Sequence, residues 1–115
     1  MRENHFNANL FDAMVNRGFK LASLTFTATA ELEVQASWPP VLYADPGGGA
    51  RTILLPAEED SKDLVFFVRN IADAAEVLTI EEDSSTTAIV ALAQNEGCML
   101  HCDGTTWRAF QNDIA

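Results

Sequence analysis

The stretch from Asn95 to Phe110 constrains the fold more than any other part of the chain. Its apolar and polar residues alternate with a period of two, which predicts extended strands whose side chains point to opposite faces in turn. The alternation stops at Asp103-Gly104, a dipeptide typical of tight turns, and a second strand follows from Thr106. Two such segments joined by Asp-Gly are the strongest short-range signal of a β-hairpin. We therefore predict a hairpin here.

Strand-like segments separated by turn residues recur along the rest of the chain at intervals of about ten residues. The predicted strands are 24–34, 41–44, 51–55, 64–70, 77–81, 86–93, 98–103 and 106–110. The charged segment 57–63 is predicted to be a surface loop with at most one helical turn. Segment 64–70 is apolar on both faces, as expected of a central strand. This spacing predicts an all-β fold, a small antiparallel β-sandwich or barrel-like module of jelly-roll-like type.

The first part of the chain follows a different pattern. Five apolar residues have the spacing of one helix face: Phe6, Leu10, Phe11, Met14 and Val15. They predict a short helix that is capped near Asn9 and ends before Gly18. A helix of about two to three turns is marginal alone, so this stripe must pack against its own domain or against another chain.

In residues 24–34, apolar and polar side chains alternate without a break. Trp38-Pro39-Pro40 follows, and proline there ends the strand. One strand of this length would span or be exchanged between subunits, or it would be bent midway. We therefore divide the chain into an N-terminal arm, residues 1–36, and a β knob domain, residues 37–115.

The net charge of −10, from 17 acidic and 7 basic residues, disfavours two classes of partner. Nucleic acid and anionic membranes both bind clustered Lys and Arg, so we expect neither. Such a charge fits simple solubility or docking onto a basic protein surface. No stretch approaches the roughly 18 unbroken apolar residues that span a bilayer, and the N-terminus is too polar for a signal peptide. We expect a protein that is made in the cytosol and is kept or assembled there.

The two cysteines are predicted to be unpaired. Cys98 and Cys102 would lie about 13 Å apart on an extended strand, which is too far for a disulfide. We expect both to act as small buried hydrophobic residues in a reducing compartment. His101 faces the opposite side of the same strand, so these residues cannot converge on a metal without a bulge.

Other candidate sites are weaker. Gly47-Gly48-Gly49 lacks the ending of a phosphate-binding loop and precedes a strand, which favours a turn. Glu81-Glu82-Asp83 with Ser84 and Ser85 lacks the spacing of an EF-hand. No nucleophile–base motif is present, so we expect no enzyme, no catalytic residue, no cofactor and no metal. Three aromatic side chains suit either the core or a sugar-stacking platform: Trp38, Tyr43 and Trp107.

Five motifs follow one another in the second half of the chain: Arg51-Thr-Ile-Leu-Leu-Pro56, Val65-Phe-Phe-Val-Arg-Asn70, Val77-Leu-Thr-Ile80, the strand after Gly97, and Asp103-Gly-Thr-Thr-Trp-Arg108. In this order and spacing, residues 44–110 resemble a small β module of tailed-phage structural proteins. That module is found in head-decoration (cement) proteins, head fibres and tail-fibre domains. The chain departs from the pattern at Asp63, where a glycine is expected, and in 86–93, which lacks the glycine-rich turn.

The resemblance implies a homotrimer. A β domain of about 70 residues buries too little surface to be comfortably stable alone, and a shared core around a three-fold axis would compensate. We expect the trimer interface on the apolar strand 64–68 and on the outward face of the hairpin strand, at Val65, Phe67, Met99 and His101.

The resemblance also implies a function, which is that of a virion structural protein. A capsid decoration or cement protein would bind the outer surface of a phage head and stabilise it. Its partners would be its own copies and the major capsid protein, and its location the capsid surface after assembly in the host cytoplasm. The helix of the arm, with its five apolar residues, would dock on the capsid. The alternative is a fibre-type adhesin module that binds a host glycan or receptor through exposed aromatic residues.

Overall fold

The computed structural model describes residues 20–83 and 87–111, and the statements below refer to these. The predicted arm helix and its five apolar residues lie outside this part of the chain. The described strands are β1 (Ser23–Thr27), β2 (Leu32–Glu33), β3 (Val41–Asp45), β4 (Arg51–Leu54), β5 (Val65–Asn70), β6 (Leu78–Glu81), β7 (Ala88–Leu92), β8 (Gly97–Cys102) and β9 (Trp107–Phe110). One turn of 3₁₀ helix, η1 (Glu58–Asp60), lies in the charged loop as predicted.

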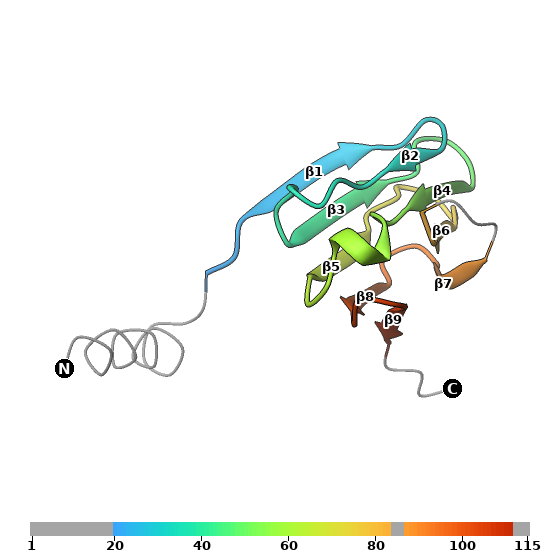
Figure 1. The fold of residues 1–115 in the computed structure, drawn as a ribbon. Coiled ribbons are helices and arrows are strands. Elements are labelled where there is room, and N and C mark those ends of the chain that lie inside the picture. Colours follow the sequence, from blue (N-terminus) through green and yellow to red (C-terminus); the bar gives the residue numbers. More distant parts are fainter. Residues whose placement is uncertain (1–19, 84–86, 112–115) are drawn as a thin grey trace.

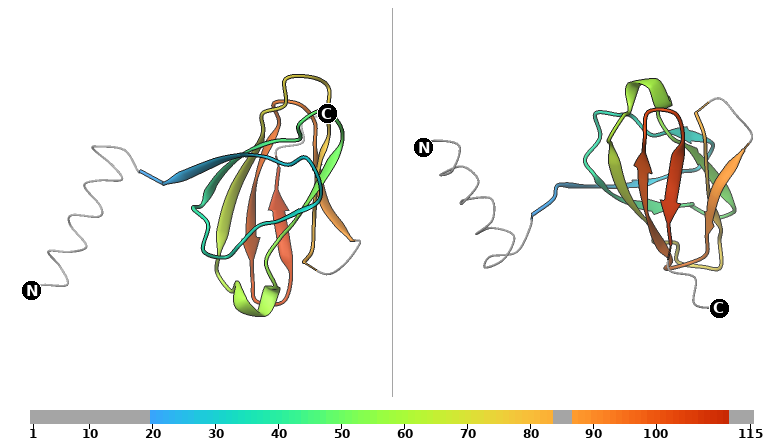
Figure 2. Two further views of the ribbon diagram at one scale, coloured as in Figure 1. Left: turned by 90° about the horizontal axis from the view of Figure 1, so that it is seen from above. Right: turned by 60° about the horizontal axis from the view of Figure 1, so that its bottom comes forward.

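The strands form two sheets that enclose one core (Figures 1 and 2). The five-stranded sheet has the order β1-β3-β5-β8-β9, and the four-stranded sheet has the order β2-β4-β6-β7. On one side the chain passes from the edge strand β1 to the edge strand β2. On the other side, β7 contacts β9. The prediction of an all-β, sandwich- or barrel-like fold is therefore confirmed, and β5 lies at the centre of its sheet as predicted.

The predicted antiparallel, jelly-roll-like arrangement is wrong for four of the seven strand pairs. The first six strands alternate between the two sheets, so same-sheet neighbours are two strands apart in sequence and run parallel. The parallel pairs are β1–β3, β3–β5, β2–β4 and β4–β6. Antiparallel pairing is found in β5–β8, β6–β7 and β8–β9. Each parallel pair is connected through a strand of the opposite sheet, which supplies the long crossover that parallel strands need.

The alternating segment 24–34 is bent, not one continuous strand. It forms β1 and β2, which lie in different sheets and meet at a corner over residues 28–31. Backbone hydrogen bonds flank the corner: Ala28 N donates to Asp45 O at 2.8 Å, and Val34 N donates to Leu54 O at 2.8 Å. Both side chains are buried. Residues 23–34 therefore belong to the same two sheets as the strands of the predicted knob, and the boundary at residue 36 does not divide the described fold.

Alternation along each strand builds the core. Leu42, Phe66 and Leu100 face inward from the five-stranded sheet, and all are buried. The four-stranded sheet contributes a matching set, all fully buried: Ile53, Leu78, Ile80 and Leu92. The core thus follows the period-two pattern that the sequence predicts.

The hairpin formed by β8 and β9 matches the prediction. Met99 pairs with Phe110 and Cys102 pairs with Trp107 across it. Cys98 and Cys102 are both buried and free. Trp107 stacks on Phe66, with ring centroids 5.9 Å apart, and its Nε1 donates to Pro56 O at 2.9 Å. The indole thereby connects the hairpin to the segment that follows β4.

Candidate interaction surface

An apolar row crosses the outer face of the five-stranded sheet. Strand register places its members side by side: Val41 pairs with Phe67, Phe67 with Met99, and Met99 with Phe110. We call these four residues the apolar row. They point away from the core because their neighbours in sequence, such as Leu42 and Leu100, point into it. Phe67 is 38% exposed and Phe110 is 56% exposed.

A hollow of about 360 Å³ opens beside this row. It is lined by Val41, Leu42, Tyr43, Phe67, Val68, Arg69, Gly97 and Cys98. Tyr43, Arg69 and Gly97 are register partners across β3, β5 and β8, and Gly97 has no side chain to fill its place. A Cβ atom at Gly97 would lie 3.1 Å from Val68 O. We call this feature the Gly97 hollow.

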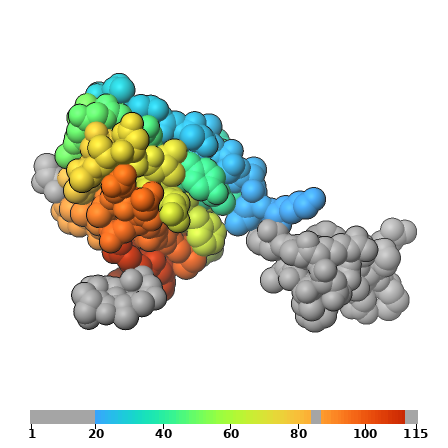
Figure 3. Space-filling view, turned by 180° about the vertical axis from the view of Figure 1, so that it is seen from behind, coloured from blue at the N-terminus to red at the C-terminus, as the bar shows by residue number. Residues whose placement is uncertain are grey.

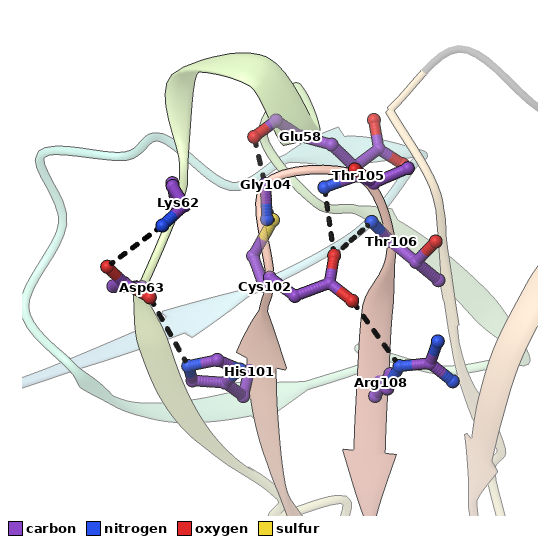
Figure 4. Close-up of polar contacts among 10 residues, drawn as sticks. Glu58, Lys62, Asp63, His101, Cys102, Gly104, Thr105, Thr106 and Arg108 are labelled. Atoms are coloured by element: carbon purple, nitrogen blue, oxygen red, sulfur yellow. Dashed lines mark hydrogen bonds and ion pairs between the residues drawn. The ribbon is translucent and has the colours of Figure 1, made fainter.

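Polar and charged side chains border the row on its other side. Val65 pairs with His101, and His101 pairs with Arg108. His101 Nε2 lies 4.0 Å from Asp63 Oδ1, and Lys62 Nζ lies 3.8 Å from Asp63 Oδ2 (Figure 4). Lys62 and Asp63 are largely exposed and His101 is partly exposed, so these contacts contribute little stability. Their effect is to frame the apolar row with polar and charged groups.

Two acidic residues shape this margin. Asp63, which stands where the resembled pattern has glycine, adopts a left-handed φ of 70°, a conformation that favours glycine. Asp103 closes the hairpin turn: its Oδ1 accepts hydrogen bonds from Thr105 N at 2.9 Å and Thr106 N at 2.8 Å. These backbone donors, aided by Arg108, lower the pKa of the Asp103 carboxyl. Arg108 Nε lies 3.6 Å from Asp103 Oδ2.

The four residues predicted for the trimer interface lie together on this face: Val65, Phe67, Met99 and His101. Val65 pairs with His101, and Phe67 pairs with Met99. Their role as an interface stays a prediction. Sequence reasoning missed Val41, Arg69 and Phe110, because their place beside the row depends on strand order. Counting outward from the Asp-Gly turn could have placed Phe110 opposite Met99.

Three acidic residues form a group that the sequence analysis did not assemble. Carboxylate oxygens of Glu58, Glu59 and Asp83 lie within 4.8 Å of one another. Desolvation by burial raises the pKa of Glu58, and the charges of Asp83, Glu82 and Glu59 raise it further. Of the acidic turn considered for calcium, Ser84 and Ser85 lie outside the described residues. The group is partly exposed and consists of carboxylates alone.

The three candidate aromatic residues do not share a surface. Trp107 is buried in the core, and Trp38 is half-buried with its ring edge-on to Phe26 at 5.3 Å. Tyr43, on the rim of the Gly97 hollow, is 37% exposed. A sugar platform of all three is therefore ruled out, and Tyr43 alone remains available.

Comparison with protein-family models, with curated proteins and with solved structures finds no match for this chain. Within residues 20–83 and 87–111, no helix has the length and apolar character needed to cross a membrane.

Proposed function

We propose that the protein is a non-enzymatic capsid decoration protein of a tailed phage, which associates with its own copies and binds the outer surface of the head. The observation that carries the proposal is the apolar row with its adjoining hollow on one exposed sheet face. Contiguous apolar surface of this kind marks an interaction site on a soluble protein. The order of the five sequence motifs points to the phage module.

Self-association through this face would form a homotrimer. Residues expected at the interface from sequence, including Phe67 and Met99, belong to the apolar row. Packing three such faces around one axis removes apolar surface from water that the single domain leaves exposed. The polar margin at His101 and Arg108 would form the rim, as polar groups do around the core of an interface.

The N-terminal segment would bind the major capsid protein. Residues 1–20 hold three basic and two acidic residues, whereas residues 21–115 hold four basic and fifteen acidic ones. The segment thus differs in charge from the rest of the chain and carries the five apolar residues with helical spacing. The first described residues, 20–22, are exposed and lead outward from β1 (Figure 3). A ligand that binds only the assembled shell stabilises it by mass action.

Two measurements test this function. Light scattering at micromolar concentration should give the mass of a trimer, and the protein should co-sediment with capsids of the phage whose genome encodes it. Deleting residues 1–20 should abolish capsid binding and leave the trimer intact. A heat-resistant monomer would refute the trimer, and unchanged capsid affinity of the truncated protein would refute the role of the arm.

An adhesin module of the phage-fibre type is the second candidate, favoured by Tyr43 on the rim of the Gly97 hollow. Aromatic rings at such rims stack on sugar faces, and Arg69 could contact polar substituents. Binding on a glycan array that is lost in Tyr43→Ala, and is unchanged in Trp38→Phe, would support this candidate. Absence of binding to any glycan on the array would count against it.

A further inference from the structure

We propose that the Gly97 hollow of one copy is the receptor for the Phe110 ring of a second copy. This inference rests on the self-association proposed above and names the contact that specifies it. The occupant is one side chain of the same protein, and the ring and the hollow both lie on the outer face of the five-stranded sheet.

Phe110 is the projecting partner. At 56% it is the most exposed of the large apolar side chains in the described part of the chain. It lies on β9, the edge strand of the five-stranded sheet, at the end of the apolar row. The ring–ring contacts found among residues 20–83 and 87–111 are Phe26–Trp38 and Phe66–Trp107, so Phe110 makes none. An aromatic ring in this position gains most by entering an apolar site on another molecule.

The Gly97 hollow fits such a ring in size and chemistry. A closed apolar cavity of about 150 Å³ holds benzene, and the hollow measures about 360 Å³. Tyr43 and Phe67 on its rim can make edge-to-face contacts with an entering ring. Arg69, which also lines the hollow, has no ion pair within the described residues, so its guanidinium is free to lie over an aromatic face.

The Phe110 ring does not occupy the hollow of its own copy. In the strand register Phe110 pairs with Met99, and the nearest lining residues, Gly97 and Cys98, lie on the adjacent strand β8. Phe110 is absent from the residues that line the hollow. Ring and hollow are therefore different parts of one face. Such a pair generates a closed ring of subunits when each copy inserts into the next, or a two-fold pair when insertion is reciprocal.

Site-directed cross-linking of the full chain tests the insertion. Gln111→Cys places a thiol beside Phe110, and Thr25→Cys places one beside Tyr43 at the rim of the hollow. Thr25 is exposed, and both substitutions retain Phe110 and every residue that lines the hollow. A short bismaleimide would then join the two sites between copies. The native thiols are poor competitors because both are buried, and burial raises the pKa of Cys98 to about 11. A covalent trimer is the expected product of the double variant.

Each outcome has a defined meaning. A covalent trimer supports both the insertion and the three-fold assembly, whereas a covalent dimer without trimer supports the insertion and refutes the three-fold assembly. No cross-link in a protein that light scattering shows to be trimeric refutes the insertion alone. A monomeric native protein refutes both.

Two control variants keep the test specific. Adding Phe110→Ser to the double-cysteine background should lower the cross-linking yield at least tenfold, and an unchanged yield would refute the insertion even where cross-links form. Replacing Gln111→Cys by Val77→Cys should give no cross-linked trimer. Val77 is also an exposed apolar residue, 39% accessible, but it precedes β6 of the other sheet.

Discussion

At the scale of single residues, Asn70 joins three parts of the chain inside the core. It is fully buried at the end of β5. Its Nδ2 donates to Glu76 O at 2.8 Å and to Leu92 O at 3.0 Å, and its Oδ1 accepts from Ala72 N at 2.9 Å. The side-chain amide therefore satisfies backbone groups that would otherwise be buried without partners.

Replacing Asn70 by leucine should lower the free energy of unfolding by about 3 kcal/mol, because two buried backbone groups and one part-buried group would lose their hydrogen bonds. Urea denaturation of the two proteins measures the difference. Gln94→Ala is the matched control, since Gln94 also bonds this loop, at Ala72 O, but from an exposed position. Its effect should stay below about 0.5 kcal/mol. Equal losses for both variants would contradict this account of Asn70.

The lowered pKa of the Asp103 carboxyl predicts that acid weakens the hairpin turn. Its folded pKa lies below the usual value of 3.8, first because Thr105 N and Thr106 N donate to the carboxylate. The stabilisation is therefore complete above that value and is lost as the pH falls through the lower, folded pKa. Measured by thermal unfolding, Asp103→Ala should be less stable than the native protein at pH 7, and the difference should shrink in acid below pH 3.8. A difference that is independent of pH would contradict this.

At the scale of elements, the corner between β1 and β2 depends on a loop that approaches it closely. In the loop after β3, Gly47 has a φ of 72°, and its N–H donates to Asp45 Oδ1 at 2.9 Å. A Cβ atom at Gly47 would lie 2.7 Å from Thr27 Cγ2, at the end of β1. The turn therefore has two reasons for glycine: its backbone conformation and the contact with the corner.

Gly48 shares the positive φ of Gly47 but not its close contact, so comparing the two distinguishes backbone strain from overpacking. Gly48 has a φ of 103°, but a Cβ atom there would meet nothing within 4 Å. Gly48→Ala should cost about 1 kcal/mol from backbone strain alone. Gly47→Ala should cost more, about 2–3 kcal/mol, because overpacking against Thr27 is added. Chemical denaturation of both variants measures the difference, and equal costs would show that the contact with Thr27 does not constrain the corner.

At the scale of the whole molecule, the winding of the chain explains why one face is left apolar. Strands that alternate between sheets bury one face of each sheet in a shared core. The outer face of the five-stranded sheet carries the apolar row, and residues 20–83 and 87–111 contain no α-helix that could cover it. In our proposal, a second copy of the protein covers this face.

A charge placed in the apolar row should therefore block assembly without unfolding the domain. Phe67→Glu should shift the mass in light scattering from trimer to monomer, because a buried unpaired carboxylate is costly at an interface. Circular dichroism should still show a folded β protein, since the side chain points away from the core. Thr79→Glu, on β6 of the four-stranded sheet, is the control and should retain the trimer. Two variants of equal mass would argue against this face as the interface.

Local sequence patterns were sufficient to predict four features of this protein. They are the strand segments, the side chains that face inward, the hairpin at Asp103-Gly104 and the unpaired cysteines. These features depend on a period of two and on turn residues, which act over a few positions. Strand partners and directions came only from the tertiary structure. Turn residues mark where a strand ends but not which sheet the next strand joins, so the sequence pattern does not reveal the parallel pairs among β1 to β6. The same non-local pairing brought Phe110 into line with Val41, and Tyr43 beside Gly97, because register across five strands is set by packing of the whole core.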